Sequence, residues 1–195
     1  MLLDKRVELL AYNLVNYSCD VQKGENVLIE ATGADYQLVA CLVREIYKKG
    51  GRPIVRLSDS RIKREIMRGL DKDTVDLMRE IDEPMMEKMQ CYIGIRGGNN
   101  SYELSDVPSD NMQLYDKEYA HPVHHNIRVD KTKWVILRYP TEGMSQMSGM
   151  STEAFEDFYF NVCNLDYAKM DRAMDSLVAL MNRTDKVRLI ANDTD

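Results

Sequence analysis

The chain has 195 residues, 44% of them hydrophobic and 30% charged, a composition typical of one globular domain with a sizeable core. Its formal net charge of −6 argues against a nucleic-acid-binding protein, because neutralising phosphates requires a basic surface. The first residues, MLLDKRVELLAYNLV, carry charges every few positions, which excludes the apolar region of a signal peptide. No stretch is apolar enough to cross a membrane. We therefore expect a soluble cytoplasmic protein that binds neither nucleic acid nor membrane.

The cysteines predict free, buried thiols rather than disulfides or zinc ligands. Cys19, Cys41, Cys91 and Cys163 are far apart, form no CxxC pair and lie among apolar neighbours. This pattern is typical of a reducing compartment.

The N-terminal third predicts a helix followed by a strand–helix–strand unit. Residues 2–17 read as an amphipathic helix, with one face made of Leu3, Val7, Leu10, Leu14 and Tyr17. The apolar run 26–31 (NVLIEA) predicts a parallel strand covered on both faces. A helix over 35–49 follows, with Leu38, Cys41, Leu42 and Ile46 facing inward. Gly50 and Gly51 end it before a second strand over 53–57.

The middle of the chain predicts two more strands separated by helices. Ser58 or Asp59 is expected to cap the next helix, and 59–89 reads as two short helices divided near Gly69. The run CYIGIRGG is a third strand ending in glycines. A polar loop, a helix around 109–119 and the segment HPVHHNIRV precede a fourth strand over 134–137.

The last third predicts two helices and a strand. Ser151 fits an N-cap, although Ala154 leaves the capping box incomplete. The buried stripe expected on this helix is Phe155, Phe158, Tyr159 and Val162. Asp166 caps a further helix to about residue 182, with Met170, Met174, Leu177 and Leu180 inward. Residues 186–191 (KVRLIA) read as a final strand, so close to the end that the domain looks cut.

The alternation of strands and helices predicts an α/β fold. We expect a mainly parallel sheet with helices on both faces, a Rossmann-like three-layer architecture without a dinucleotide fingerprint.

The histidines lie in one segment, at His121, His124 and His125. His-x-x-His-His could offer two metal ligands. Pro122 argues against a regular helical pairing of His121 with His125, and no cysteine or HExxH motif lies nearby. We interpret the segment as a loop or the approach to a strand, with a metal role as the alternative.

Polar residues follow the predicted strands, at the edge where open α/β sheets bind ligands. They are Thr32, Gly33 and Asp35, then Ser58 and Asp59, the loop 95–100, and Thr141 and Glu142. No segment matches GxGxxG or a P-loop, so ordinary β–α turns are the favoured interpretation and nucleotide binding stays open.

The remaining polar clusters favour solvated surface. The basic residues Arg61, Lys63, Arg64 and Arg68 are interrupted by Glu65 and predict a solvated helix face. The same interpretation applies to the carboxylates of the last two helices, Glu153, Glu156, Asp157, Asp166, Asp171 and Asp175. A loop with Met144, Met147 and Met150 predicts a flexible packing surface on which another domain or subunit could dock. No nucleophile elbow or other catalytic constellation is recognisable.

Three runs carry a resemblance to a known family: WVILRYPT (134–141), MSTEAFEDF (150–158) and NLDY (164–167). They resemble the metallo-aminopeptidase family that includes aminopeptidase T, aminopeptidase S and PepS, the thermophilic-type leucyl aminopeptidases. The resemblance extends to the N-terminal helix, the KGENVLIEA strand and residues 186–195, and so covers nearly the whole chain.

The resemblance implies an N-terminal α/β domain that packs on a separate C-terminal catalytic domain. In that family the catalytic domain binds two divalent metal ions, zinc, cobalt or similar, through Glu, His and Asp side chains. A metal-activated water then releases the N-terminal residue of a peptide. None of those side chains matches a position here, and the cluster His121, His124 and His125 is not the family's metal site. We therefore assign no catalytic, metal-binding or substrate-binding residue and no cofactor to this chain.

The expected organisation is an N-terminal α/β domain over 1–185 and a strand over 186–195 that leads toward the catalytic domain. The expected partners are that catalytic domain, peptide substrates through the parent enzyme, and a second copy in a homodimer. The chain alone is expected to be inactive. Two alternatives stay open: a stand-alone α/β small-molecule-binding module without peptidase activity, and a nucleotide-binding domain.

Overall fold

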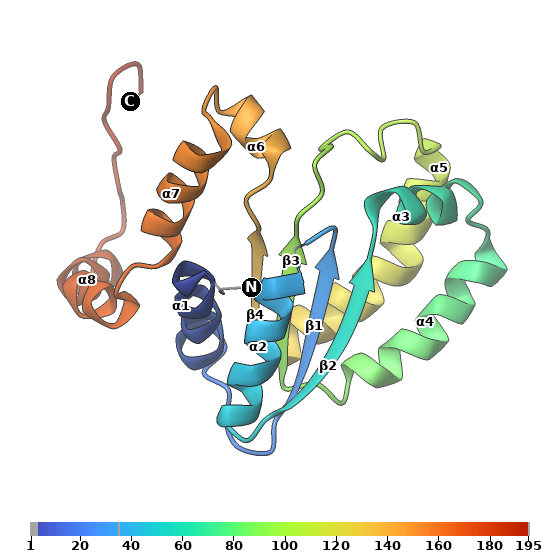
Figure 1. Ribbon diagram of the computed structural model, residues 1–195, viewed down its shortest axis with the longest axis horizontal. Coiled ribbons are helices and arrows are strands. Elements are labelled where there is room, and N and C mark those ends of the chain that lie inside the picture. The colour runs from blue at the N-terminus through green and yellow to red at the C-terminus, as the bar shows by residue number, and fades with distance from the viewer. Residues whose placement is uncertain (1–3, 35, 195) are drawn as a thin grey trace. The chain divides into compact units, whose positions relative to one another are not determined.

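The computed structural model describes residues 4–34 and 36–194 (Figure 1). It divides into two compact units, one ending at Asn164 and the other beginning at Leu165. The first holds the sheet and most of the helices, and the second holds the last helix, α8.

A parallel sheet of four strands forms the centre of the first unit. The strands are β1 (Asn26–Thr32), β2 (Arg52–Ser58), β3 (Cys91–Arg96) and β4 (Lys133–Arg138), in the spatial order β2-β1-β3-β4. In register, Ile29 of the central strand β1 lies between Val55 of β2 and Ile93 of β3. The predicted α/β class with a mainly parallel sheet is confirmed, and so are all four predicted strands of this unit.

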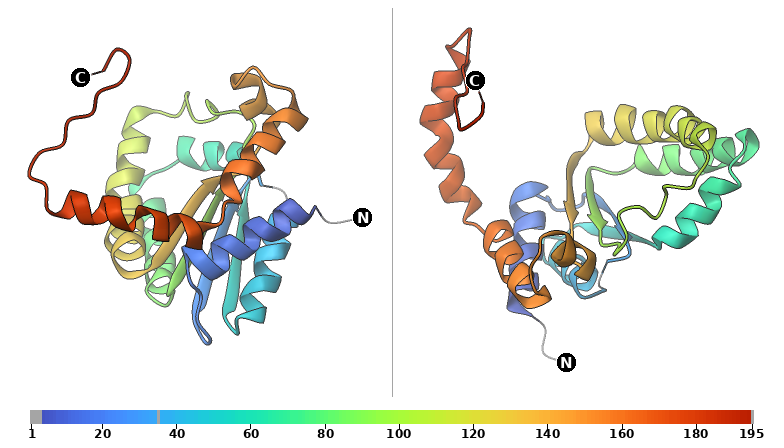
Figure 2. Two further views of the ribbon diagram at one scale, coloured as in Figure 1. Left: turned by 90° about the vertical axis from the view of Figure 1, so that its left-hand side faces the viewer. Right: turned by 90° about the horizontal axis from the view of Figure 1, so that it is seen from above.

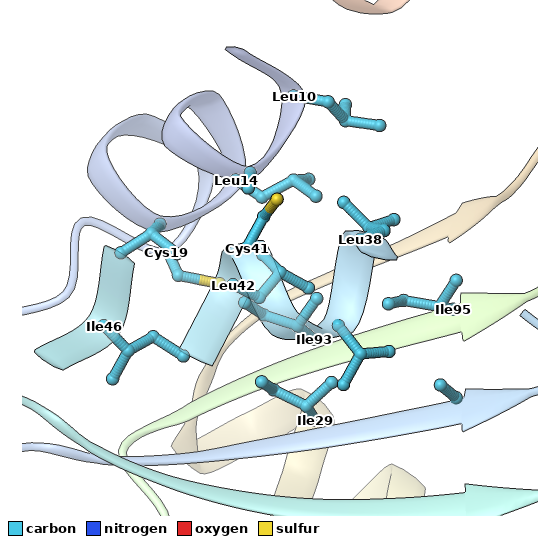
Figure 3. Close-up of a cluster of buried hydrophobic side chains, with 14 of the residues drawn as sticks. Leu10, Leu14, Cys19, Ile29, Leu38, Cys41, Leu42, Ile46, Ile93 and Ile95 are labelled. Atoms are coloured by element: carbon cyan, nitrogen blue, oxygen red, sulfur yellow. The ribbon is translucent and has the colours of Figure 1, made fainter. Parts of the chain in front are cut away.

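One face of the sheet is covered by α1 (Lys5–Asn13), a π-helical turn η1 (Leu14–Ser18), α2 (Tyr36–Lys48) and α7 (Thr152–Cys163). Asp4 caps α1 by accepting a hydrogen bond from Arg6 N at 2.8 Å, in place of the predicted start at residue 2. Figure 3 shows Leu10 of α1 and Leu38 and Leu42 of α2 on the side of the sheet where Ile29 of β1 and Ile93 of β3 lie. All four residues predicted to face inward from α2 are buried, as are Val7, Leu10 and Leu14 of the first helix. Tyr17 is exposed instead, and Leu3 and Asp35 lie outside the described residues.

The opposite face is covered by α3 (Ser60–Arg68), α4 (Lys72–Met86), α5 (Ser109–Tyr115) and a long π-helical segment, η2 (Asp116–Val129). Figure 2 shows the sheet between the two groups of helices, as the three-layer prediction requires. Leu28 and Tyr92, which alternate with the residues facing α2, point into this second core with Met67, Met86 and Val123. The predicted division of 59–89 into two helices is confirmed, with Asp59 capping the first of them.

The helix α6 (Glu142–Met147) precedes α7. The predicted cap of α7 is confirmed, and its predicted buried stripe is partly right. Ser151 caps α7, its Oγ accepting from Ala154 N at 3.3 Å. Phe155 and Tyr159 are buried as predicted, but Phe158 is 56% exposed and Val162 is 49% exposed. Phe160 is buried in their place, because Arg6 and Tyr139 pack on its ring. The helix is therefore rotated relative to the stripe that spacing alone indicated.

The second unit contains α8 (Tyr167–Asn182), which Asp166 caps as predicted by accepting from Lys169 N. The expectation of an inward stripe is wrong: Met170, Met174, Leu177 and Leu180 are all exposed, since no other element of this unit covers them in the part that the structure describes. The predicted strand over 186–191 is also wrong. Residues 186–190 have no regular structure, and Ala191 forms only an isolated bridge with Thr194.

Candidate functional site: a basic cavity beside the carboxyl ends of the strands

The carboxyl ends of the strands meet at one edge, toward which the arrowheads of β1, β2 and β3 point in Figure 1. The Thr32 and Ser58 hydroxyls are 2.8 Å apart across β1 and β2. A side chain on Gly97 would have its Cβ 2.7 Å from Ala34 Cα and 2.8 Å from Gly33 O, so the turns after β1 and β3 touch through their backbones. The helix after β1 covers one face of the sheet and the helices after β3 cover the other. This edge is therefore the topological switch point at which such sheets bind ligands.

Two of the predicted strand-end residues have structural roles. Asp59 caps α3 and forms an ion pair with Arg61, and Thr141 caps α6 by accepting from Met144 N. These are the ordinary β–α turns that the sequence favoured. Thr32, Arg96 and Gly98 instead line open space.

A cavity of about 590 Å³ lies beneath this edge, between the second face of the sheet and α3, α5 and η2. A neighbouring hollow of about 390 Å³ shares Thr32, Lys63 and Arg96 with it. The volume of the first suits a small organic ligand.

An acidic pair and two tyrosines hold one arginine at the wall of the cavity. Arg56 of β2 donates to Asp82 of α4 at 2.6 Å and lies 3.8 Å from Glu30 of β1. Tyr119 of η2 donates to the other oxygen of Asp82, and Tyr92 donates to Glu30 at 2.7 Å. Burial alone would raise the pKa of Asp82, but the hydrogen bonds from Arg56 and Tyr119 lower it, so the carboxylate stays ionised. Burial and the nearby carboxylates raise the pKa of both tyrosines, which keeps them protonated donors.

Three other cations face the cavity without such partners. Arg128 of η2 is only 8% exposed, yet within the described residues its Nε and Nη1 have no hydrogen-bond partner. Lys63 of α3 lies over the ring of Tyr115, 5.1 Å from its centroid, and burial together with Arg96 lowers the pKa of its ammonium group. The third cation, Arg96, ends β3.

The prediction that the basic residues of α3 form a solvated face is wrong for Lys63. Arg64 pairs with Asp106 and Glu65, and Arg68 lies 3.7 Å from Glu65, so these two behave as surface residues. Lys63 does not, because it lies one helical turn before the buried Met67 and shares its side of the helix. That i, i+4 spacing was visible in the sequence.

The histidine segment is helical, so the predicted loop is wrong. It lies within η2, where Tyr119, Val123 and Ile127 recur every fourth residue and are buried against the sheet. That packing outweighs the hydrogen bond that Pro122 cannot donate. The rings of His121 and His125 stack with centroids 5.6 Å apart, the pairing that Pro122 argued against.

His124 packs edge-on against Tyr119, with ring centroids 5.7 Å apart. Burial, aided by Arg128 and Lys63, lowers the pKa of His124 to about 4, so it is neutral at pH 7. Among the described residues no group of three or more His, Cys, Asp or Glu side chains is placed to hold a metal ion. The residues present therefore do not fit the family's two-metal centre.

The remaining candidates are structural. All four cysteines are free, as predicted, and Cys19, Cys41 and Cys91 are buried. Burial raises the pKa of Cys19 and of Cys91 to about 12, so neither is a thiolate at neutral pH. The predicted solvated carboxylates of α7 and α8 are exposed except Glu156, which is half-buried and faces Arg6 at 3.7 Å. The predicted methionine loop is partly wrong, because Met144 and Met147 lie in the helix α6. Met147 is 71% exposed there, and Met144 lines the smaller hollow.

The parallel sheet and its switch-point cavity define an α/β protein without a dinucleotide fingerprint. Residues 3–194 match the model of the thermophilic metalloprotease (M29) family, and the chain belongs to that family. The structure of wild-type AmpT from Thermus thermophilus is similar, with a TM-score of 0.63 and 17% sequence identity over 82% of this chain and 43% of that one. The chain thus spans less than half the length of that relative.

Two weaker structural matches are an alcohol dehydrogenase superfamily protein from Novosphingobium aromaticivorans and the CurK enoyl reductase. The first has a TM-score of 0.33 and 11% identity, and the match covers 84% of this chain and 49% of that one. The second has a TM-score of 0.34 and 14% identity, and the match covers 82% of this chain and 50% of that one. No curated protein matches the chain. Within the described residues, no helix is both long and apolar enough to cross a membrane.

Proposed function

We propose that the chain is the non-catalytic N-terminal domain of a two-metal aminopeptidase that releases N-terminal residues from peptides. The observation that carries the proposal is the family match over residues 3–194, set beside coverage of only 43% of AmpT. A two-metal peptidase needs several carboxylate and imidazole ligands around a pair of ions. In this proposal a further domain supplies them.

The apolar side chains of α8 support a packing role for the chain. Met174, Leu177 and Val178 are 41%, 57% and 52% exposed, which is unusual for one helix of a finished domain. We propose that this surface packs on the catalytic domain and that the parent enzyme is a homodimer. Light scattering on the parent enzyme tests the second point. The free cysteines support a reducing, cytoplasmic location.

A two-part experiment tests the proposed function. The purified 195-residue protein, supplied with zinc or cobalt ions, is assayed with leucyl-p-nitroanilide, and the gene is sequenced past the codon for Asp195. We expect no hydrolysis above that of metal alone, and a reading frame that continues into a Glu-, His- and Asp-rich domain. Metal-dependent hydrolysis by the purified chain would overturn the non-catalytic assignment, and a stop codon directly after Asp195 would overturn the assignment as a domain of a longer enzyme.

A stand-alone binding module without peptidase activity is the second candidate function. The cavity of about 590 Å³ favours it. The stop codon described above is the result that would select this candidate.

A further inference from the structure

The cavity has an excess of positive charge in a protein whose net charge is −6. Arg56, Lys63, Arg96 and Arg128 line it, whereas Glu30 is its one carboxylate lining residue among those the structure describes. Glu30 and Asp82 already balance Arg56. Glu30 also acts electrostatically on Lys63 and Arg128, but none of Lys63, Arg96 and Arg128 forms an ion pair with a carboxylate of the described residues.

Arg128 is the strongest indication that the positive charge of the cavity serves an anionic ligand. Its guanidinium carbon lies 4.8 Å from the ring centroid of Trp134 and 5.1 Å from that of Tyr92. These contacts stabilise the charge through the ring faces but do not use the N–H donors. Nε and Nη1 are buried and unpartnered, an arrangement that native proteins rarely keep unless the donors serve something else.

Lys63 and Arg96 place two more donors around the same space. Lys63 enters from α3, Arg96 from the end of β3 and Arg128 from η2, so three separate elements direct cations into one hollow. No carboxylate of the described residues forms an ion pair with Lys63, whose ammonium group lies over the Tyr115 ring. An oxyanion bound between the three side chains would accept the hydrogen bonds that their N–H groups no longer make to water.

Besides the polar residues Thr32, Ser58, His124 and His125, the rest of the lining is mainly apolar and aromatic, which sets the kind of molecule that carries the anion. Ile62, Ile66 and Met78 lie on the helical side and Ile136 on the sheet side. A cavity of about 590 Å³ is much larger than an inorganic ion needs and falls in the usual range for small organic ligands.

We propose that this cavity binds a small organic anion, with Arg128, Lys63 and Arg96 holding a carboxylate or phosphate group and the isoleucines and methionines holding an apolar body. The Asp59 cap already satisfies an N–H at the start of α3, so the anion is bound by side chains and not by a phosphate loop. The proposal does not depend on the chain's role in an aminopeptidase.

Calorimetric titration of the 195-residue protein in Tris–chloride tests the site. The probes are phenyl phosphate, phenylacetate, inorganic phosphate and acetate, with uncharged phenylacetamide as the reference. We expect one of the two aromatic anions to bind at least about tenfold more tightly than phenylacetamide and than its own inorganic or acetate counterpart. Which aromatic anion binds better distinguishes a phosphate from a carboxylate ligand.

The variant Arg128→Met keeps the length of the side chain and removes its charge. We expect it to weaken the preferred aromatic anion at least about tenfold, and Lys63→Met to weaken it in the same direction. Without ligand, Arg128→Met should unfold at the same temperature as the wild type or a higher one, because it removes buried N–H donors that have no hydrogen-bond partner. A purely structural arginine would give the opposite thermal result.

Arg52→Met is the matched control. Arg52 is exposed at the opposite end of β2, where it donates to Asn26, and its loss should leave anion binding unchanged. The proposal is overturned if neither aromatic anion binds at about 10 mM, if phenylacetamide binds equally well, or if Arg128→Met binds like the wild type.

Discussion

Asp82 shows how one side chain ties three elements of the fold together. From α4 it accepts hydrogen bonds from Arg56 of β2 and Tyr119 of η2, and it is 9% exposed. A buried carboxylate of this kind costs free energy to desolvate, which its two charged and polar partners offset. Removing its charge therefore leaves Arg56 with only the more distant Glu30.

We expect Asp82→Asn to lower the free energy of unfolding at pH 7 by about 2 kcal/mol, the usual effect of weakening buried hydrogen bonds to a charged group. The pKa of Asp82 is lowered in the folded state, so its contribution is complete above the unfolded pKa of about 3.9 and is lost as the pH falls through the lower folded value. Urea unfolding of both proteins at pH 7 and below about pH 3.9 measures the difference.

Asp76→Asn is the control for Asp82→Asn, because Asp76 forms its ion pair with Lys72 on a surface of α4 where each side chain is at least 32% exposed. Its loss should cost at most about 1 kcal/mol. Equal effects of the two substitutions, or an Asp82→Asn effect that does not shrink in acid, would contradict the role given to Asp82.

Residue-level function was the part that the sequence predicted least. The burial of Cys19, Cys41 and Cys91 was predictable from their apolar neighbours in the sequence, because an apolar segment is buried together with the cysteine it contains. Arg128 and Lys63 were not assigned to a site, because their significance depends on which neighbours α3, β3 and η2 bring near them. Only long-range packing decides whether a charged side chain has a partner.

At the scale of elements, the contact between the turns after β1 and β3 restricts side-chain size at Gly97. A Cβ on Gly97 would meet backbone atoms of Ala34 and Gly33 within 2.8 Å, whereas a Cβ on Gly98 would meet Ser60 Oγ at 2.9 Å. Backbone atoms at such a contact cannot move without shifting a strand end. A serine side chain can rotate away.

We therefore expect Gly97→Ala to destabilise the protein by about 1–3 kcal/mol, the usual cost of overpacking, and Gly98→Ala to cost clearly less. Urea unfolding of the two neighbouring variants checks the order. A larger loss for Gly98→Ala would contradict the backbone contact between the two turns.

Elements were predicted well where local signals agreed with packing. The strand β1 and helix α2 followed from an apolar run and a repeating inward face, and caps at Asp59, Ser151 and Asp166 fixed three helix starts. The histidine segment was predicted wrongly because the interpretation rested on Pro122 and did not consider the helical spacing of Tyr119, Val123 and Ile127. Residues 186–191 failed because their alternating pattern has no described strand to pair with.

At the scale of the whole molecule, the two compact units differ in what stabilises them. The central strands β1 and β3 are buried between two layers of helices, whereas α8 has no buried residue. An isolated helix of 16 residues is only marginally stable in water. The overall α/β class was predictable because it depends on the order of elements, whereas the division after Asn164 depends on contacts that the order does not reveal.

We expect amide hydrogens of α8 to exchange with solvent much faster than those of β1 and β3 in the 195-residue protein. Hydrogen–deuterium exchange followed by mass spectrometry of peptides from 167–182, 26–32 and 91–96 measures this. The peptide from α2 is an internal control for a helix that is packed on the sheet. Protection of α8 equal to that of β3 would show that a second surface covers it in solution.

The strand order β2-β1-β3-β4 also has a consequence for synthesis on the ribosome. β2 pairs with β1, β3 pairs with the free side of β1, and β4 pairs with β3, so each new strand joins an edge that already exists. No strand has to be inserted between two that have paired earlier. The sheet can therefore grow in the order in which its strands leave the exit tunnel, and a nascent chain released after Arg96 would already contain a three-stranded parallel sheet.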